Sequence, residues 1–370
     1  MTTAPRRPSP TPAATSSSPP DSAVEEEQIT VGLAATLELA YGLQPAGIKR
    51  IPEGTATDNF AVLDQSGQRH FAKVYRTREP QALELERASI ELSEYAAGGS
   101  VATARVTRSL DHELIATHGH MPISLWSYVT HTETAEGTLA GARWASAGTA
   151  MGRLHNRLAT YPAAAPSQAP GAAVCDVGTS RDRFNRLIHA YQHKPALGEF
   201  EAWALRATRD RQAIMADVEK TLASLPQLTV QILHGDTAGP NVLFNDTEVA
   251  ALVDFRPPAT GYLAWEIARL GCDPKSVLDN SATDWLAGYT DLTLAYREAN
   301  PKASADDLLS SLRVGCAAML CSAFPLSVPV ERPHLVDAAL EAYGRVRHEA
   351  ALTLLDRLPD MEEALREALR

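Results

Sequence analysis

The chain has 370 residues, 45% of them hydrophobic and 21% charged. It is therefore long enough for about two globular domains with a sizeable core, and its composition excludes a fibrous or wholly disordered protein. The formal net charge of −11 argues against a protein built to neutralise nucleic-acid phosphates or to coat an anionic membrane. We expect no nucleic-acid partner and no membrane partner, and a cationic small molecule would suit the acidic balance.

The N-terminus carries no export signal that we recognise. Arg6 and Arg7 are not followed by an apolar segment. The most apolar stretch, residues 314–330, contains Pro325 and Pro329 and is too short to span a bilayer. The four cysteines form no CxxC pair. These features predict a cytoplasmic protein with free thiols, and they leave its oligomeric state open.

The first part of the chain changes from a polar tail to a region rich in strands. Residues 1–28 consist largely of Pro, Ser, Thr and Ala with a short acidic run, which predicts a disordered tail. A short helix is expected over 29–43. The alternating patterns that follow predict strands over 48–51, 59–63 and 70–75, then a helix over 81–97, then strands over 106–117 and 122–130.

Beyond about residue 135 the apolar spacing becomes helical. Brief strand patterns interrupt the helices at 230–233, 242–244 and 249–253. The order predicts an α+β protein with a small antiparallel sheet and a larger, mainly helical part. We expect a disordered tail over 1–28, an N-terminal nucleotide-binding lobe over 29–125 and a C-terminal catalytic and substrate-binding lobe over 126–370.

The most informative segment is HGDTAGPNVLF, residues 234–244, followed by Asp254 thirteen residues after Asn241. A strand, a loop and a hairpin in this order bring the carboxylates of Asp236 and Asp254 and the amide of Asn241 to one site. Phosphoryl transfer needs such a set, because one group must position the attacking hydroxyl and others must hold Mg²⁺ on the nucleotide phosphates. The spacing, with strand patterns on both sides, rarely arises by chance.

These residues carry a resemblance to a known family. Residues 234–243 followed by Val253-Asp254-Phe255 resemble the catalytic segment of the aminoglycoside phosphotransferase/choline kinase-like family, relatives of the protein kinases, and are nearest its homoserine kinase type II-like branch. Three other segments resemble family motifs, namely MGRLH at 151–155, GYLAWEIARL at 261–270 and FAKVY at 71–75. The resemblance covers roughly residues 30–345 and implies a bilobal protein-kinase-like fold.

For the catalytic segment, the resemblance implies one role for each matched residue. Asp236 would be the catalytic residue that orients the substrate hydroxyl and accepts its proton. Asn241 and Asp254 would bind Mg²⁺ through oxygen atoms. His234 is expected to pack the loop and not to act as the base. Glu266, where the family usually has Asp, is expected to brace the catalytic loop.

For the nucleotide, the resemblance implies that Lys73 contacts the α- and β-phosphates of ATP as a point charge. Its ion-pair partner would lie on the helix that follows. Three glutamates compete for that role, and Glu86, thirteen residues after the lysine, fits the family interval better than Glu84 or Glu91.

The remaining nucleotide contacts come from a loop and a connector. The loop over 53–60 would cover the phosphates with its backbone amides and with Thr55, Thr57 and Asn59, although it lacks the GxGxxG pattern. The adenine would bind to the backbone between Leu125 and Val129.

We therefore expect ATP- and Mg²⁺-dependent transfer of the γ-phosphoryl group to a hydroxyl of a small molecule, such as an amino alcohol, a sugar or an aminoglycoside-like compound. Two alternatives remain: a tailoring kinase that acts on Ser or Thr of a peptide, and a catalytically silent binding protein with a kinase fold. Glu266 lies only twelve positions after Asp254, which disfavours a regulated protein kinase. Arg256 would either reach phosphate or substrate or form a salt bridge. Antibiotic inactivation and metabolic phosphorylation both fit the motif.

Overall fold

The computed structural model describes residues 22–52 and 57–370 and divides them into two compact units. The first unit comprises the described residues up to Arg78 together with Thr107–Leu125, and the second comprises Glu79–Val106 together with Trp126–Arg370. The lobes expected over 29–125 and 126–370 stay a prediction. Glu79–Val106, which we had placed in the N-terminal lobe, belongs to the second unit, because the helix it contains buries Leu92 and Ala96 in that unit's core.

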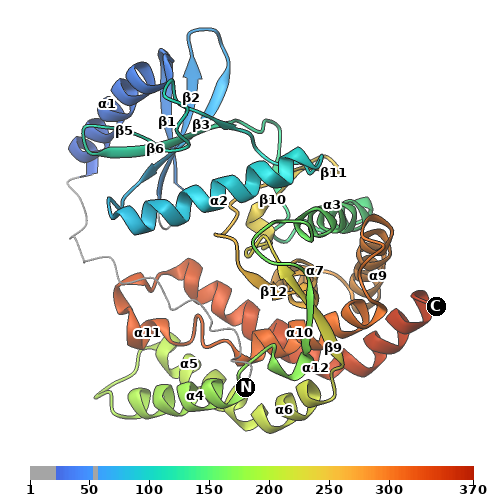
Figure 1. Ribbon diagram of the computed structural model, residues 1–370. Coiled ribbons are helices and arrows are strands. Elements are labelled where there is room, and N and C mark those ends of the chain that lie inside the picture. Colours follow the sequence, from blue (N-terminus) through green and yellow to red (C-terminus); the bar gives the residue numbers. More distant parts are fainter. Residues whose placement is uncertain (1–21, 53–56) are drawn as a thin grey trace. The chain divides into compact units, whose positions relative to one another are not determined.

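The first unit is a twisted sheet with a helix on it (Figure 1). Strands β1 (Pro45–Ile51), β2 (Thr57–Asp64) and β3 (Arg69–Tyr75) are antiparallel neighbours. Next to β3 lies β6 (Met121–Ser127), which pairs with β5 (Ala116–His118) and is followed in the sheet by β4 (Val106–Thr107). Burial alternates along β2 and β3, as expected for a sheet with one covered face. The covered face packs against helix α1 (Ser22–Tyr41) through a small apolar cluster that includes Leu33, Leu37, Phe60, Val62, Ala72 and Val74.

Two expectations for this unit were wrong in detail. Helix α1 begins at Ser22, so residues 22–28 are helical and do not belong to a disordered tail; residues 1–21 lie outside the described residues. The strand expected over 106–117 exists only at its two ends, as β4 and β5. The chain turns between them at His112, whose φ is 68°, and the Ser109 amide donates to the Glu113 carbonyl across this turn.

The second unit is mainly helical and has one large apolar core. Helix α3 (Ala142–Leu158) crosses α9 (Ala282–Ala299) at very short range. A Cβ atom on Gly148 would lie 2.0 Å from the Leu292 carbonyl oxygen, and one on Gly152 would lie 2.6 Å from that of Tyr296. Glycine at these two positions therefore lets the two backbones touch. The other helices are α2 (Pro80–Gly98), α4 (Val177–Gln192), α5 (Glu199–Ala213), α6 (Met215–Ala223), α7 (Leu263–Gly271), α8 (Pro274–Asp279), α10 (Ala305–Cys321), α11 (Val328–Glu331) and α12 (Ala338–Ala368).

Two small sheets in the second unit hold the catalytic segment. One has the order β11-β10-β7 and the other β12-β9-β8. Residues 233–241 connect β9 (Gln227–Ile232) to β10 (Val242–Asn245), so they run from one sheet to the other. The hairpin continues into β11 (Glu248–Leu252). The partner strands β7 (Glu133–Thr134), β8 (Ser167–Pro170) and β12 (Thr260–Tyr262) were not predicted, because two to four residues are too few to show a period.

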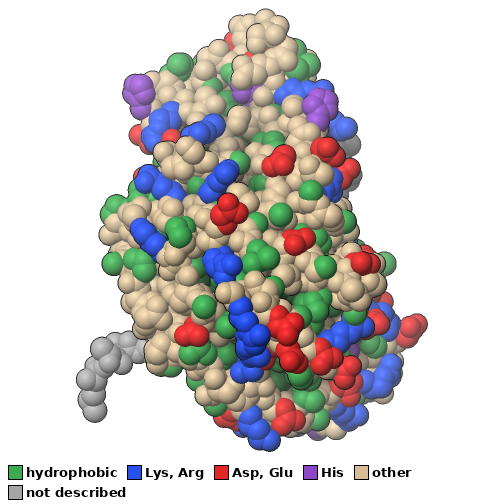
Figure 2. Space-filling model, turned by 90° about the vertical axis from the view of Figure 1, so that its right-hand side faces the viewer, with side chains coloured by type: hydrophobic (Ala, Val, Ile, Leu, Met, Phe, Trp, Pro, Cys, Tyr) green, Lys and Arg blue, Asp and Glu red, His purple; other side chains and the backbone are tan. Residues whose placement is uncertain are grey.

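The mixed α+β class with a small antiparallel sheet and many helices is the class that the sequence predicted. Acidic and basic side chains are interspersed on the face drawn in Figure 2, with no broad field of one sign. Within residues 22–52 and 57–370, no helix has the length and apolar character that a membrane crossing requires.

Candidate active site

One buried carboxylate accepts hydrogen bonds from the backbone of the loop that follows β9. Glu266 on α7 is fully buried, and it accepts hydrogen bonds from the backbone amides of His234 at 3.0 Å and Gly235 at 2.7 Å. The Thr237 hydroxyl donates to the Glu266 carbonyl at 3.3 Å. The expectation that Glu266 braces the catalytic loop is confirmed.

A second layer of buried polar groups orients Glu266. The Nε2 atom of His155 lies 2.9 Å from the Glu266 carboxylate, and Nδ1 of the same ring lies 2.8 Å from the hydroxyl of Tyr296. Burial by itself raises the pKa of Glu266, but the hydrogen bonds from His155 and from the loop amides outweigh it and hold the pKa below its usual value. The carboxylate is therefore ionised and can accept all three hydrogen bonds.

His234 packs the loop, as expected. The ring is fully buried, lies against Phe255 with centroids 4.1 Å apart, and accepts a hydrogen bond at Nδ1 from the Asp236 amide at 3.2 Å. Burial lowers the pKa of His234, against the opposing effect of the nearby carboxylates. A neutral ring whose Nδ1 is an acceptor is a positioning group and not a base for the substrate.

Strand register brings Asn241 and Asp254 together. Val242 pairs with Leu252 across the β10–β11 hairpin, and the Val253 amide donates to the Asn241 carbonyl at 3.0 Å, so Asp254 follows directly beside Asn241. The backbone of Asp254 has φ 67°. This left-handed conformation is uncommon outside glycine, although Asp tolerates it better than most residues, and such conformations concentrate at functional sites.

The donor set at this point suits a hard cation. The Asn241 Nδ2 atom donates to the Asp236 carbonyl at 2.8 Å, which leaves Oδ1 as the side-chain atom that can face a ligand. An amide oxygen and the Asp254 carboxylate are ligands that Mg²⁺ prefers, with nucleotide phosphates completing the coordination. In the described part of the chain, no group of three or more His, Cys, Asp or Glu side chains could hold a metal, but a site completed by phosphates does not need one.

Asp236 is bracketed by two arginines of the same unit. Arg256 directs Nη2 to the Asp236 Oδ2 atom at 2.8 Å, and Arg269 forms an ion pair with Oδ1. Of the two roles considered for Arg256, the structure therefore contains the salt bridge. Arg269 was missed by the sequence reading, although it lies three residues after Glu266 and thus on a neighbouring face of the same helix.

Three of the expected nucleotide contacts share one face of the first unit. Asn59 on β2 is the cross-strand partner of Lys73 on β3, and the Thr57 hydroxyl donates to the Asn59 Oδ1 atom at 2.9 Å. All three are half-buried, on the face opposite the apolar cluster. Thr55 lies outside the described residues.

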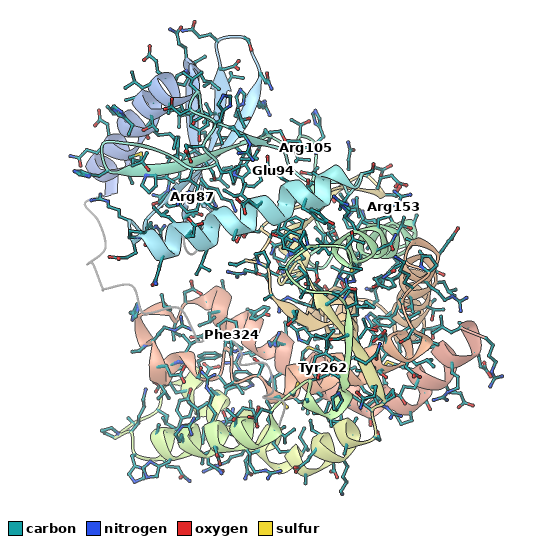
Figure 3. All side chains as sticks on the ribbon, in the orientation of Figure 1. Arg87, Glu94, Arg105, Arg153, Tyr262 and Phe324 are labelled. Carbon is teal, nitrogen blue, oxygen red and sulfur yellow. The ribbon has the colours of Figure 1, made fainter. Side chains whose placement is uncertain are left out.

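The other two expected nucleotide residues belong to the second unit. Glu86 is half-buried on α2, whereas Glu84 is exposed and pairs with Arg87 at 3.2 Å (Arg87 is labelled in Figure 3). Lys73 and Glu86 belong to different units, and their ion pair stays a prediction. Val129 follows β6, and its carbonyl accepts a hydrogen bond from the Thr132 hydroxyl at 3.5 Å.

The eleven residues between Asp254 and Glu266 include strand β12 and the start of helix α7. Gly261 pairs with Gln231 as β12 joins β9, and the Tyr262 hydroxyl, labelled in Figure 3, donates to the Pro170 carbonyl at 2.9 Å. This short, fixed connection has no room for a long activation segment.

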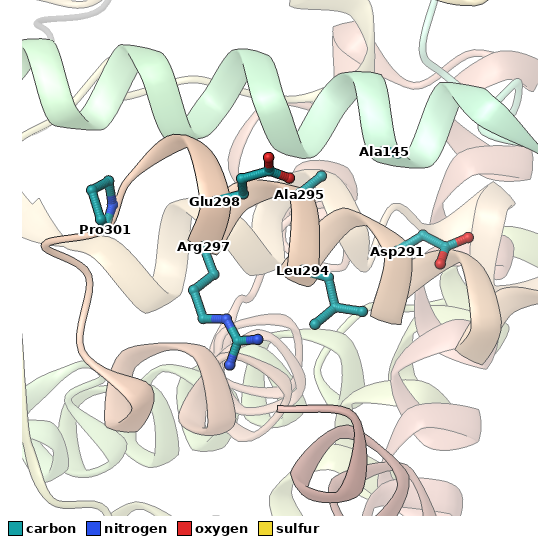
Figure 4. Close-up of a pocket in the computed structure, with 7 residues that line it drawn as sticks. All are labelled: Ala145, Asp291, Leu294, Ala295, Arg297, Glu298 and Pro301. Atoms are coloured by element: carbon teal, nitrogen blue, oxygen red, sulfur yellow. The ribbon is translucent and has the colours of Figure 1, made fainter. Parts of the chain in front are cut away.

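A separate surface pocket contains none of the candidate catalytic residues. It lies along α9, and no residue of the catalytic segment lines it (Figure 4). We therefore assign the site to the catalytic loop and not to this hollow, which is formed by Ala145, Asp291, Leu294, Ala295, Arg297, Glu298 and Pro301.

The model of a known protein family matches more than half of this chain. Residues 47–301 match the model of the phosphotransferase enzyme family. A search of curated proteins found no match.

Similar solved structures include a spectinomycin phosphotransferase in complex with ADP and spectinomycin, with a TM-score of 0.59, 11% identity and coverage of 87% of this chain and 97% of that one. An aminoglycoside phosphotransferase from Alicyclobacillus acidocaldarius has a TM-score of 0.56 and 15% identity, covering 96% and 98%. A microcompartment-associated aminopropanol kinase has a TM-score of 0.58 and 16% identity, covering 90% and 98%. At these identities the structures establish a shared kinase-like fold.

Proposed function

Because this chain belongs to the phosphotransferase enzyme family, we propose that it transfers the γ-phosphoryl group of ATP, with Mg²⁺, to a hydroxyl of a small molecule. The observation that carries the proposal is the meeting of Asp236, Asn241 and Asp254 in one loop and hairpin. Because similar structures are named for spectinomycin and for aminopropanol, we propose an amino alcohol, a sugar or an aminoglycoside-like compound as the first acceptors to test. The assignment to the homoserine kinase type II-like branch stays a prediction.

In the reaction that we propose, the acceptor hydroxyl oxygen bonds to the γ-phosphorus while the bond from that phosphorus to the β,γ-bridging oxygen breaks. The hydroxyl proton passes to the carboxylate of Asp236, and ADP leaves. Asp236 acts by placing the hydroxyl in line and by accepting its proton. The buried hydrogen bonds that Glu266 accepts from the loop amides fix the loop that carries Asp236, so the loop needs little reorganisation when substrates bind.

Asn241 and Asp254 would hold Mg²⁺, which supplies charge neutralisation on the β- and γ-phosphates when bound. Lys73 would contact the α- and β-phosphates from the first unit. Thr57 and Asn59 lie on the same half-buried face as Lys73 and would hydrogen-bond to the same phosphates. Glu86 and the backbone near Val129 complete the proposed nucleotide site.

The test is ADP formation from ATP with a panel of amino alcohols, sugars and aminoglycosides. We expect Asp236→Asn to lower kcat by about 10²- to 10⁴-fold, the range for loss of a positioned proton acceptor, without loss of nucleotide binding in a thermal-shift assay. Asp246→Asn is the matched control, because Asp246 lies in the turn of the β10–β11 hairpin with φ 55° and Asn tolerates that conformation equally well. Wild-type turnover by the Asp236→Asn protein would refute the proposal, as would a wild-type protein that binds nucleotide and transfers nothing.

A further inference from the structure

Both carboxylate oxygens of Asp236 are engaged by guanidinium groups. Arg256 approaches Oδ2 with Nη2 at 2.8 Å and Nε at 3.2 Å, and Arg269 pairs with Oδ1. The Asp236 side chain is 14% exposed, whereas those of Arg256 and Arg269 are 64% and 35% exposed. The two cations therefore lie on the open side of the loop, where an acceptor would approach Asp236.

This pairing conflicts with the role proposed for Asp236. A carboxylate that orients a hydroxyl and takes its proton needs an oxygen that the hydroxyl can reach. Two guanidinium groups contact the two oxygens from the open side of the loop. An arginine that turns to another anion leaves one of these oxygens open to the hydroxyl.

Contacts with neighbouring residues hold both arginines beside Asp236. The Arg256 amide donates to the His234 carbonyl at 2.9 Å, and a Cβ atom on Gly235 would lie only 2.8 Å from the Arg256 Cβ atom. Gly235, with φ 87°, therefore leaves room for Arg256 against the loop. Arg269 stacks on Trp265, with its guanidinium carbon 5.1 Å from the ring centroid. Both side chains therefore start from positions next to the Asp236 carboxylate.

We propose that Arg256 and Arg269 bind an anionic group of the acceptor, and that this binding releases Asp236 for catalysis. The acceptor is then a small hydroxy compound that carries a carboxylate or a phosphate, because the planar guanidinium fork matches these groups in two-point contacts. The inference rests on the proposed function. It runs against the cationic acceptor that the net charge of −11 suggested, because the charges beside the acceptor, and not the total, determine which ligand binds.

The γ-phosphate of the nucleotide is the other source of such an anion. The acceptor is favoured by the geometry around Asp236. The proposed metal ligand Asn241 contacts the backbone carbonyl of Asp236, whereas both arginines contact its carboxylate. The carboxylate is the part of Asp236 that must meet the acceptor hydroxyl.

The test uses pairs of acceptors that share a hydroxyl and differ in an anionic group: glycerate and glycerol, L-serine and ethanolamine, L-homoserine and 3-amino-1-propanol, glucuronate and glucose. We expect the anionic member of a pair to have a kcat/KM about 10- to 100-fold higher, the range for one charge-assisted hydrogen bond. Arg256→Gln and Arg269→Gln should each raise KM for that member about 10- to 100-fold and remove the preference. Lysine at either position should restore only part of it, because lysine keeps the charge and loses the fork.

The control is Arg181→Gln, which removes an arginine that pairs with Glu219 at the same 2.8 Å and should leave every constant unchanged. Binding of AMP-PNP and of ADP to each variant separates the two anion sources. Loss of AMP-PNP affinity without loss of ADP affinity would show that the arginines hold the γ-phosphate and would overturn the inference. Turnover restricted to the uncharged or cationic members would overturn the inference and leave the proposed function standing. If no member of any pair supports ADP formation, the result would count against both the inference and the proposed function.

Discussion

Two aspartates in this chain are each bracketed by two arginines, and they lie in different surroundings. Asp58 on β2 pairs with Arg50 at 2.6 Å and with Arg76 at 2.8 Å, within the first unit. Asp236 pairs with Arg256 and Arg269 in the second. Asp58 belongs to a strand, and its side chain is 9% exposed. Asp236 belongs to a loop that lies over a buried carboxylate.

The difference shows that the partners of a charged group do not define its role. Arg50 comes from β1 and Arg76 follows β3, so Asp58 ties the strands on both sides of its own strand together. The arginines at Asp236 flank a residue that already has its loop fixed by Glu266 and Asn241. Removing the first pair should cost folding free energy, and removing the second should change chemistry.

The largest effect on stability is expected at Glu266, which accepts hydrogen bonds from the catalytic loop. Glu266→Ala would leave the amides of His234 and Gly235 and the ring of His155 without their buried acceptor. We expect a loss of about 3–5 kcal/mol in the free energy of unfolding, the range for breaking a buried charged contact. Urea unfolding followed by tryptophan fluorescence measures it, because four of the five tryptophans lie in helices α3, α5, α7 and α9 of the second unit. Glu266→Gln keeps an acceptor of the same shape, and an equal loss for both variants would contradict the argument.

The next effect compares the two aspartates directly. Asp58→Asn weakens two charge-assisted hydrogen bonds, and we expect it to destabilise the protein by about 1–3 kcal/mol. Its effect should be seen by circular dichroism and be small in tryptophan fluorescence. Asp236→Asn should show the reverse pattern, with nearly unchanged unfolding and lost transfer. If both variants lose stability equally, the distinction between a structural and a catalytic pair fails.

A smaller effect on stability is expected at Gly235, the glycine that packs against Arg256. Gly235 and Gly67 have φ values of 87° and 85°, but a Cβ atom would meet nothing within 4 Å at Gly67 and would meet Arg256 at Gly235. Alanine at either position adds backbone strain of about 1–2 kcal/mol. Only Gly235→Ala should also displace Arg256, with loss of the acceptor preference in the kcat/KM assay. Equal behaviour of the two variants in that assay would contradict the packing argument.

The smallest effect is a difference in acid sensitivity. The pKa of His234 is lowered from its ordinary 6.5 by burial, so the unfolded chain binds the proton more readily and the second unit loses stability as the pH falls below about 6.5. The pKa of Asp58 is lowered from 3.8 by its hydrogen bond with Arg76. Its contribution is complete above that value and is lost only as the pH falls through the lower pKa of the folded state.

Unfolding at pH 7, 5 and 3.5 tests this order, with tryptophan fluorescence for the second unit and circular dichroism for both. His234→Gln should remove part of the loss between pH 7 and 5, and Asp58→Asn should remove part of the loss below pH 4. His118→Gln, at an exposed histidine, is the control for the first change. A loss that begins in the first unit would reverse the expected order.

The sequence predicted much of the fold, because the long elements have clear periods and the catalytic segment has a distinctive spacing. Strands β2 and β3 were expected nearly as they stand. The short strands β7, β8 and β12 were missed, since they are specified by the partners they pair with and not by their own residues. Helix α2 was expected over nearly its observed length, but the sequence does not show which core its apolar face joins.

In the candidate site, too, local features could be predicted from the sequence and contacts between distant residues could not. Asp236, Asn241 and Asp254 could be found because their spacing is local. The contact of His155 with Tyr296 joins residues 141 positions apart, and no local pattern encodes it. Arg269 could have been noticed from its place one turn after Glu266, but its ion pair with Asp236 depends on the path of the loop between two sheets.

The close crossing of α3 and α9 limits the positions at which this chain could be joined to a related protein in a chimera. The glycines at 148 and 152 bring α9 near enough for Tyr296 to meet His155, and His155 in turn holds Glu266. A chimera joined between α7 and α9 would keep every residue of the catalytic segment and replace the helix that orients its support. Such a junction yields an active enzyme only when the incoming α9 presents a hydroxyl at position 296 and backbone that fits against Gly148 and Gly152.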